Sequence, residues 1–487
     1  MKLLMIFFVI SSAIYALNLP SCNKDNKKVF FIKSIKDWEH INDNDKEIFC
    51  IYPGLYINDK DEDKQFLITK SGTKEHPRYI LLYNGNNTHP AKLSKNQIAR
   101  FILKFKDASY WIVDRQAFFE PMGGAGENVL KNSSNIIFNR LYFKDTTSVF
   151  TIFNNSNNNK ILNSYFIKTK WSIKNKNLED VAAINLVALN PNDKILNTLI
   201  KGNEIVNYVD AIQLVRLDRA YSKLAKIDFG GTKIINNTLY TTDEFYTNCK
   251  GVSKKDGECA FSENGIDIKG GSQDSKNPVI IQNNIIFGYK KADSSFSDLS
   301  DPGSAVVAHY GVKNLVIKNN TIFNSNYGFS SAGPIENRVA LKSCLIENNT
   351  FYSIKNHALN IFGSLKKDIF DGAYNLTIKS NSFLDIKGPV IKLYNSKKVV
   401  IKDNKFINSE GFWIPDFIEY PEYANYNSKD LHIINNLFFN TPIDFPSYAK
   451  TKNNLSKSNN TLKSTLKKIY LNRYTINPKS LDLNLYD

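Results

Sequence analysis

The sequence predicts an all-β protein built as a single-stranded right-handed parallel β-helix with a short N-terminal capping helix. The first observation is a repeat that begins near residue 110: an aliphatic run, an asparagine, any residue, and a large apolar residue. The second is strict alternation of apolar and polar residues in several short segments, which is typical of strands. The repeated asparagines are Asn139, Asn163, Asn203, Asn237, Asn284, Asn320, Asn349, Asn381, Asn404 and Asn436.

The spacing of these asparagines favours a β-helix over other solenoids. One short interval, from Asn381 to Asn404, matches one β-helix coil, whereas the long interval from Asn237 to Asn284 fits a coil plus a loop. Asparagine suits a tight bend because it tolerates left-handed dihedrals and bonds its own backbone. Stacked in register, the asparagines are expected to form a hydrogen-bonded ladder. Leucine-rich repeats need more leucine, and helical repeats need a 3.6-residue period that is absent.

The chain divides into four segments in order. Residues 1–16 read as a signal peptide, since a lysine precedes an apolar run that is too short to span a membrane. Residues 17–60 form an N-terminal cap, in which Ser34–Ile41 has the helical spacing of a short amphipathic helix that would close the solenoid. Residues 61–449 form the β-helix, and residues 450–487 form a C-terminal extension rich in Lys, Asn and Ser.

The five cysteines suit an oxidising compartment. Cys22 with Cys50, and Cys249 with Cys259, are the expected disulfides, and Cys344 is expected to be a buried free thiol because it stands among aliphatic residues. We therefore expect a secreted or periplasmic protein, with a lipid anchor at Cys22 as the alternative. No segment is expected to span a membrane, and we expect a monomer.

Composition limits the classes of partner. Hydrophobic residues make up 42% of the chain, so a large core can form, and the net charge of +16 favours an anionic partner. The lysines are scattered and no recognition module is visible, so nucleic-acid binding is not expected. Of the anionic partners that such a charge favours, an anionic lipid and an acidic polysaccharide remain.

Three segments can be aligned coil on coil by their alternation: Val181–Val187, Val209–Val215 and Asn264–Lys269. Equivalent positions of neighbouring coils lie about 4.8 Å apart, so distant parts of the chain become neighbours. A fourth segment, Ala305–Tyr310, continues the series. The residues expected to point into the core are Ile184, Ile212, Ile266 and Val306.

The outward positions of the same segments carry the candidate site. Asn185, Gln213 and Asp267 form one polar column, and Lys269 and His309 form a second column beside it. The residues expected to flank the columns are Asp210, Glu263 and Arg216.

Two long insertions, Thr241–Phe261 and Lys290–Pro302, are expected to wall a cleft beside these columns. The structural alternative is that Asp267 and Lys269 form only a surface ion pair, worth about 0–1 kcal/mol.

Several of these segments resemble polysaccharide lyases of the chondroitinase B and alginate lyase type. Ser71–Thr73 and His76–Ile80 resemble that family's early turn and strand, Glu263–Gly271 resembles its segment of acidic residues before a lysine, and Ala308–Gly311 resembles its Arg-His-Gly strand. The likeness runs from about Gly54 through the repeats. Two features depart from the family pattern: the acidic residues are spaced differently, and no arginine stands in the Arg-His-Gly position.

The resemblance implies a secreted lyase that cleaves a uronic-acid polymer by β-elimination. In that family, acidic and amide side chains hold a calcium ion that makes the C–H bond beside the sugar carboxylate more acidic. The implied base is Lys269, and the proton donor is open between His309, Tyr310 and Arg216. The residues implied as calcium ligands are Asp267, Glu263, Asp210 and Gln213.

Two other functions fit the same sequence. A non-catalytic glycan-binding or surface-adhesion β-helix would retain glycans without product. A uronate C5-epimerase would abstract the same proton and return it to the other face, and pectate lyases and mannuronan epimerases share the expected architecture.

Overall fold

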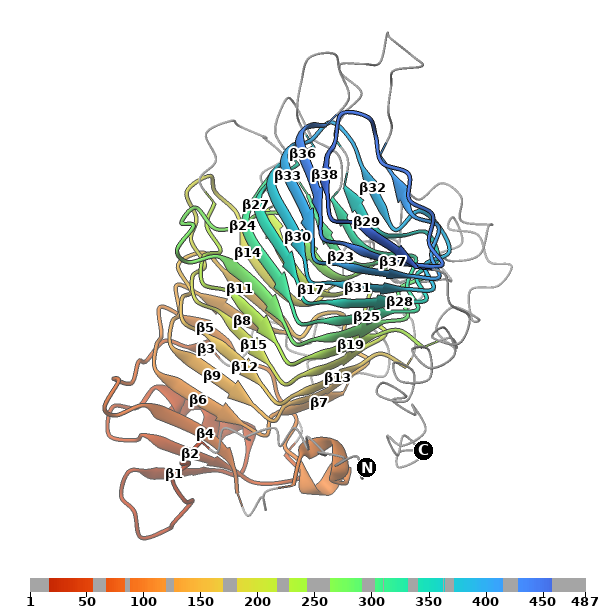
Figure 1. Cartoon of the computed structure of the whole chain (residues 1–487). Coiled ribbons are helices and arrows are strands. Elements are labelled where there is room, and N and C mark those ends of the chain that lie inside the picture. The colour runs from red at the N-terminus through yellow and green to blue at the C-terminus, as the bar shows by residue number, and fades with distance from the viewer. Residues whose placement is uncertain are drawn as a thin grey trace, which may run out of the picture.

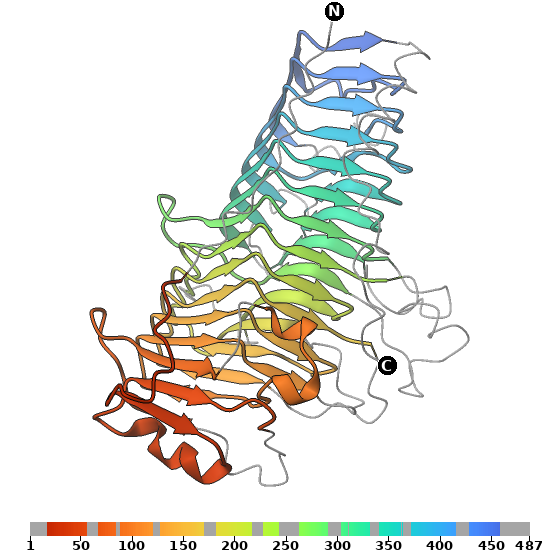
Figure 2. The ribbon, with the colours of Figure 1, turned by 90° about the horizontal axis from the view of Figure 1, so that it is seen from below.

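The protein is a solenoid of three parallel sheets, as the computed structural model shows (Figures 1 and 2). The prediction of an all-β parallel β-helix is confirmed. The structure describes residues 17–55, 67–83, 88–119, 127–169, 182–216, 227–242, 263–290, 303–309, 311–331, 340–361, 363, 372–414 and 428–457.

Each sheet is a stack of short strands contributed by successive coils. The first sheet contains β1 (Val29–Ile32), β2 (Ile48–Ile51), β4 (Arg78–Leu82), β6 (Trp111–Asp114), β9 (Ile136–Asn139), β12 (Lys160–Leu162), β15 (Leu199–Lys201), β18 (Lys233–Ile235), β21 (Val279–Gln282), β24 (Val312–Lys318), β27 (Leu341–Glu347), β30 (Ala373–Lys379), β33 (Lys397–Lys402), β36 (Lys429–Ile434) and β38 (Lys450–Lys452). The second sheet contains β7 (Ala117–Phe119), β10 (Tyr142–Lys144), β13 (Tyr165–Ile167), β16 (Glu204–Val206), β19 (Thr238–Tyr240), β22 (Ile285–Phe287), β25 (Thr321–Phe323), β28 (Thr350–Tyr352), β31 (Ser382–Leu384), β34 (Lys405–Ile407), β37 (Leu437–Phe439) and β39 (Leu455–Lys457). The third sheet contains β3 (Leu67–Ile68), β5 (Lys104–Lys106), β8 (Asn128–Lys131), β11 (Phe150–Phe153), β14 (Ala182–Ala188), β17 (Asp210–Arg216), β20 (Asn264–Ile268), β23 (Ser304–Ala308), β26 (Tyr327–Ser331), β29 (His357–Ile361), β32 (Ile391–Leu393) and β35 (Phe412–Trp413).

The core is one continuous apolar column that fills the inside of the coil from Ile32 to Phe438. Side chains alternate between the two faces of a strand, so each strand sends every second residue inward. The four positions predicted to point inward are fully buried: Ile184, Ile212, Ile266 and Val306.

An asparagine ladder runs inside the bend between the first and second sheets. Each rung before the last donates from Nδ2 to Oδ1 of the next rung at 2.9–3.1 Å, and every rung donates to an isoleucine carbonyl of a neighbouring coil. Every polar atom of an inner rung is thereby paired, which a buried amide requires. The rungs are Asn203, Asn237, Asn284, Asn320, Asn349, Asn381, Asn404, Asn436 and Asn454.

The first two repeated asparagines are not rungs, contrary to prediction. Ser164 occupies the ladder position of its coil, where its N–H donates to Asn203, and Asn163 stands one residue earlier. Asn139 precedes its equivalent position by two residues, because Tyr142 pairs with Tyr165. The motif therefore identifies these two coils correctly, but its asparagine is not the residue at the ladder position.

The sharp backbone of the bend lies one residue before the ladder. Asn236, Asn283 and Asn319 have φ values of 55–57°, in the left-handed region, and each directly precedes a rung. Asparagine is tolerated there better than most residues. We predicted that the ladder asparagine itself makes the bend; instead its neighbour bends, and the rung supplies hydrogen bonds.

The N-terminal end is closed by a short helix, as predicted (Figure 2). Ser34 is its N-cap and forms a capping box with Asp37. The Ser34 backbone N–H donates to Asp37 Oδ2 at 2.8 Å. The element is a 3₁₀ helix, η1 (Ile35–Asn42), and it buries Trp38 and Ile41 against the core. Two more 3₁₀ turns follow, η3 (Pro90–Lys92) and η4 (Lys95–Gln97).

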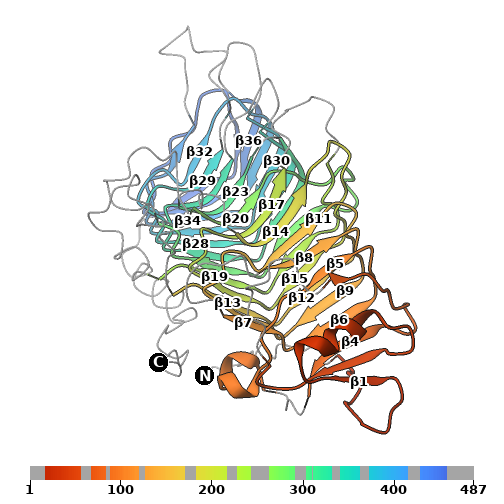
Figure 3. The ribbon, with the colours of Figure 1, turned by 180° about the vertical axis from the view of Figure 1, so that it is seen from behind.

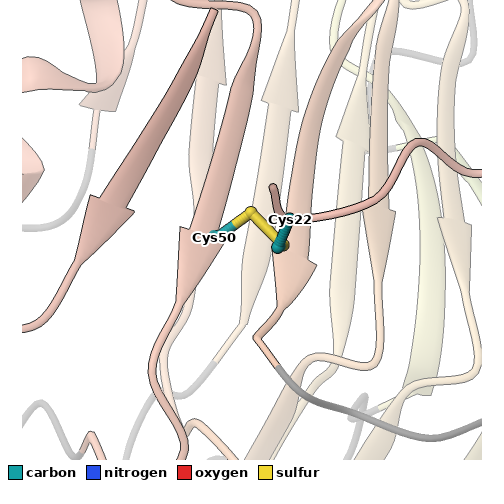
Figure 4. Close-up of a disulfide and its surroundings, with 2 residues drawn as sticks. All are labelled: Cys22 and Cys50. Atoms are coloured by element: carbon teal, nitrogen blue, oxygen red, sulfur yellow. A yellow bond between two sulfur atoms is a disulfide. The ribbon is translucent and has the colours of Figure 1, made fainter. Parts of the chain in front are cut away.

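The predicted disulfide between Cys22 and Cys50 is present and ties the segment before β1 to β2 (Figure 4). Cys344 is buried and unpaired, as predicted. The pair of Cys249 and Cys259 lies outside the described residues, as do the predicted signal peptide and most of both long insertions. In the described part of the chain, no helix is long and apolar enough to cross a bilayer.

Candidate functional site

The candidate site lies on the outer face of the third sheet, where β14, β17, β20 and β23 are neighbours (Figure 3). The register places Asn185 beside Gln213 and Gln213 beside Asp267, as the alignment of the coils predicted. Beyond Asp267, the same column continues with Val307.

Asp267 is the centre of the site. Its Oδ2 lies 2.8 Å from Lys269 Nζ and accepts a hydrogen bond from Gln213 Nε2 at 3.0 Å, and its Oδ1 lies 3.2 Å from His309 Nε2. The Asp267 side chain is only 2% exposed, whereas Lys269 and His309 are each 19% exposed. One buried carboxyl group thus contacts an amine and an imidazole that are both partly exposed.

Asp210 reaches the same cluster because the strand interrupts its alternation. Ala211 and Ile212 are both fully buried in the core, so Asp210 and Gln213 stand on either side of them and their side chains meet. Gln213 Nε2 lies 3.3 Å from Asp210 Oδ2. On the next coil, Gly265 occupies the equivalent of Ala211, and a Cβ there would lie 2.5 Å from the Ala305 carbonyl oxygen, so the site requires glycine.

The two carboxyl groups are driven in opposite directions. Burial raises the pKa of Asp210 well above its ordinary value, and the nearby charges of Asp267 and Glu263 raise it further. Burial also acts to raise the pKa of Asp267, but His309 and Lys269 outweigh it and hold that pKa below its ordinary value. The same cluster therefore raises the pKa of the Asp210 carboxyl group and lowers that of the Asp267 carboxyl group.

The remaining predicted site residues are placed less closely. Glu263 is half-buried at the start of β20 and acts on Asp210 through its charge. Arg216 ends β17 beside Ala188, and its side chain, like the whole of Tyr310, lies outside the described residues. Asn264 was missed by sequence reasoning: its side chain hydrogen-bonds Asp210. Its position opposite Asp210 in the register was the available signal.

The residues present do not fit the predicted calcium ion. Gln213 turns its amide nitrogen, a donor, toward both carboxyl groups, and Asp267 already faces Lys269 and His309. Calcium needs several oxygen ligands directed at one point. Within the residues that the structure describes, no group of three His, Cys, Asp or Glu side chains is placed to hold a metal.

This arrangement can perform proton transfer beside an anion. An Asp–His contact fixes which imidazole nitrogen carries the proton, and the other nitrogen is then the basic one. A partly exposed ammonium next to it can bind a carboxylate. The cluster thus offers the residue types that a base and an anion-binding group require.

Comparison with known proteins gives structural neighbours only. No protein-family model matches the chain, and no curated protein matches it by sequence. A mannuronic acid specific polysaccharide family 6 lyase from human gut microbiota aligns over 91% of this chain and 94% of its own, with 12% identity and a TM-score of 0.39.

Two further neighbours have other activities. The catalytic domain of a GH87 alpha-1,3-glucanase aligns over 90% of this chain and 70% of its own, with 11% identity and a TM-score of 0.38. PfbA, a surface adhesin of Streptococcus pneumoniae, aligns over 87% of both chains, with 12% identity and a TM-score of 0.34. The neighbours thus include lyases, a glucanase and an adhesin.

Proposed function

We propose that the protein is a secreted polysaccharide lyase that cleaves a uronic-acid-containing glycan by β-elimination on the outer face of the third sheet. The observation that carries the proposal is the buried Asp267 carboxylate, which holds Lys269 and His309 side by side at 2.8 and 3.2 Å. The net charge of +16 favours an acidic polymer, and the disulfide of Cys22 with Cys50 suits an oxidising compartment.

His309 is proposed as the general base. If its Nε2 donates to Asp267, the lone pair is on Nδ1, and that nitrogen can take a proton from the substrate. Asp267 then acts as a positioning residue that also stabilises the imidazolium once it forms.

Lys269 is proposed to bind the sugar carboxylate instead of acting as the base predicted from the sequence. Its contact with Asp267 at 2.8 Å favours the protonated ammonium, which has no lone pair for a proton. An ammonium next to the uronate carboxylate stabilises the negative charge that develops there as the C5 proton leaves.

The elimination balances with these two groups. His309 takes the C5 hydrogen as a proton, the C5–H electron pair forms the C4–C5 double bond, and the C4–O bond breaks. The imidazolium returns the proton to the leaving oxygen. Tyr310 stays an alternative donor predicted from the sequence.

The experiment that tests the proposal measures ultraviolet absorbance from the new C4–C5 double bond on alginate, polygalacturonate, chondroitin and hyaluronan. We expect product on at least one polymer, and His309→Ala should slow its formation about 10²–10⁴-fold, the usual contribution of a general base. Product formed at the same rate by the variant, or none from any of these polymers, contradicts the proposal.

A matched control is available on the first sheet. His432 lies 2.9 Å from Asp430, so it repeats the Asp–His contact away from the site. The variant His432→Ala should leave the rate unchanged. If the wild-type protein retains glycan without product, it is a binding protein; if it changes the uronate composition without unsaturated ends, it is an epimerase.

A further inference from the structure

The column that contains Asp267 continues along the third sheet to an aromatic surface. After Val307, the register brings in Ser330, Asn360, Lys392 and finally Trp413. The strands β20, β23, β29 and β32 lie in series along this sheet (Figure 3). Five coil steps separate Asp267 from Trp413, which is about 24 Å along the axis.

Trp413 is one of the few large apolar side chains left exposed, with 44% of its surface accessible. Lys392 Nζ lies 5.0 Å from the centre of its ring and 5.9 Å from that of Tyr394. The Tyr394 ring meets Trp413 edge-on at 5.7 Å and 87°. The exposed Trp413 indole thus has an ammonium group and the Tyr394 ring in contact with it. We call Lys392, Tyr394 and Trp413 the distal platform.

Asn360 adds a buried amide to the same column. It is 3% exposed, its Nδ2 lies 3.4 Å from Ser330 Oγ, and its Oδ1 accepts no hydrogen bond from the residues that the structure describes. A buried amide oxygen without a donor is costly, so its presence next to the platform calls for an explanation. A ligand hydroxyl reaches Oδ1 only if the atoms that cover this oxygen move aside.

These features together match an acidic sugar. Indole rings present a flat apolar face for the C–H face of a sugar ring and a polar edge for water. The Lys392 ammonium complements a carboxylate. Nucleic-acid bases also stack on aromatic rings, so the test below includes an oligonucleotide as the rival ligand.

We propose that the distal platform binds a uronic sugar of the polymer whose cleavage takes place at Asp267, about five coils away. This inference rests on the proposed function. A chain that reaches both places must cover about 24 Å, so the platform acts on long polymers and leaves a disaccharide untouched. The platform adds affinity through effective concentration without contacting the reacting bond.

The experiment measures calorimetric affinity and turnover for polygalacturonate and alginate, for their disaccharides, and for neutral dextran. Trp413→Ala should weaken binding of the preferred uronate polymer about tenfold, the loss of one cation-flanked aromatic contact. Trp413→Phe should restore most of the affinity, and Lys392→Gln should reduce the preference for uronate over dextran. Disaccharide binding should stay at its wild-type value in all variants.

Tyr374 is the matched control, because its ring lies 5.7 Å from Lys342 Nζ and 5.5 Å from Lys398 Nζ on the first sheet. Tyr374→Ala should bind polymer normally.

Two outcomes overturn the platform: polymer affinity of Trp413→Ala within about twofold of wild type, or equal loss on polymer and disaccharide. A poly-dT oligonucleotide that binds with the same dependence on Trp413 overturns the assignment to a glycan. Polymer binding that depends on Trp413 in a protein without lyase product supports the platform and refutes the proposed function alone.

Discussion

The inside of the bend and the outside of the third sheet use the same column geometry for opposite purposes. Inside, asparagine recurs from Asn203 to Asn454, and every inner rung makes the same hydrogen bonds at nearly the same distances. Outside, successive coils carry Asn185, Gln213, Asp267 and Val307, so no residue type is repeated. The inner column is neutral and fully paired, whereas the outer column carries charge.

This difference separates structural from functional residues in a solenoid. Equivalent positions on successive coils have the same surroundings, so the same residue type can satisfy them on every coil. A column whose residue type changes over two or three coils indicates a local requirement that the other coils do not share. At Asp267, that need is to hold Lys269 and His309. Four variants or treatments test this contrast.

The largest effect is expected from Asn320→Ala, an inner rung that is 1% exposed. It leaves the Asn284 N–H and the Ile281 carbonyl without their partner, so the free energy of unfolding should fall by about 4 kcal/mol. Urea unfolding measures the loss. Asn454→Ala at the half-buried end of the ladder should cost clearly less. Equal losses for the two variants would show that the ladder does not act as a paired stack.

Next in size is Asp267→Asn, which removes the outer carboxylate. The amide no longer fixes the tautomer of His309 or holds the Lys269 ammonium, so lyase turnover should fall at least about 100-fold. Asp430→Asn, which disturbs the similar contact of His432, should leave turnover intact. A turnover of Asp267→Asn within about threefold of wild type would mean that the cluster has no role in the reaction.

A smaller effect on stability is expected from Asp210→Asn. The pKa of Asp210 is raised in the folded state, so its carboxyl group stabilises the fold fully below its ordinary pKa of 3.8 and loses that contribution as the pH rises toward the raised value. The asparagine variant should therefore gain stability relative to wild type as the pH goes from 4 to 8. Urea unfolding across that range measures the difference, and a difference that does not change with pH would refute the raised pKa of Asp210.

The smallest effect is expected from a chelator. Lys269 supplies positive charge where the resemblance implied calcium, and the described residues do not fit that ion. EDTA should leave both turnover and the melting temperature unchanged, as measured on the preferred polymer before and after dialysis. A tenfold loss that added Ca²⁺ restores would return the predicted calcium ion to the mechanism.

The period of the sequence was enough to predict the architecture and the column. The strand alternation around Ile184, Ile212 and Ile266 identified the buried face, because a shift of one residue would expose all three. The same alignment brought His309 of one coil beside Asp267 and Lys269 of the preceding coil.

Only the three-dimensional arrangement decided the chemistry within that column. The opposite pKa shifts of Asp210 and Asp267 depend on burial and on cross-coil distances, which no spacing in the sequence reports. The start of the ladder at Asn203 instead of Asn139 depends on the register of the bends. Repeats specify which face a side chain occupies, because alternation is a property of the backbone; which atoms then meet depends on rotamers and neighbours that belong to other coils.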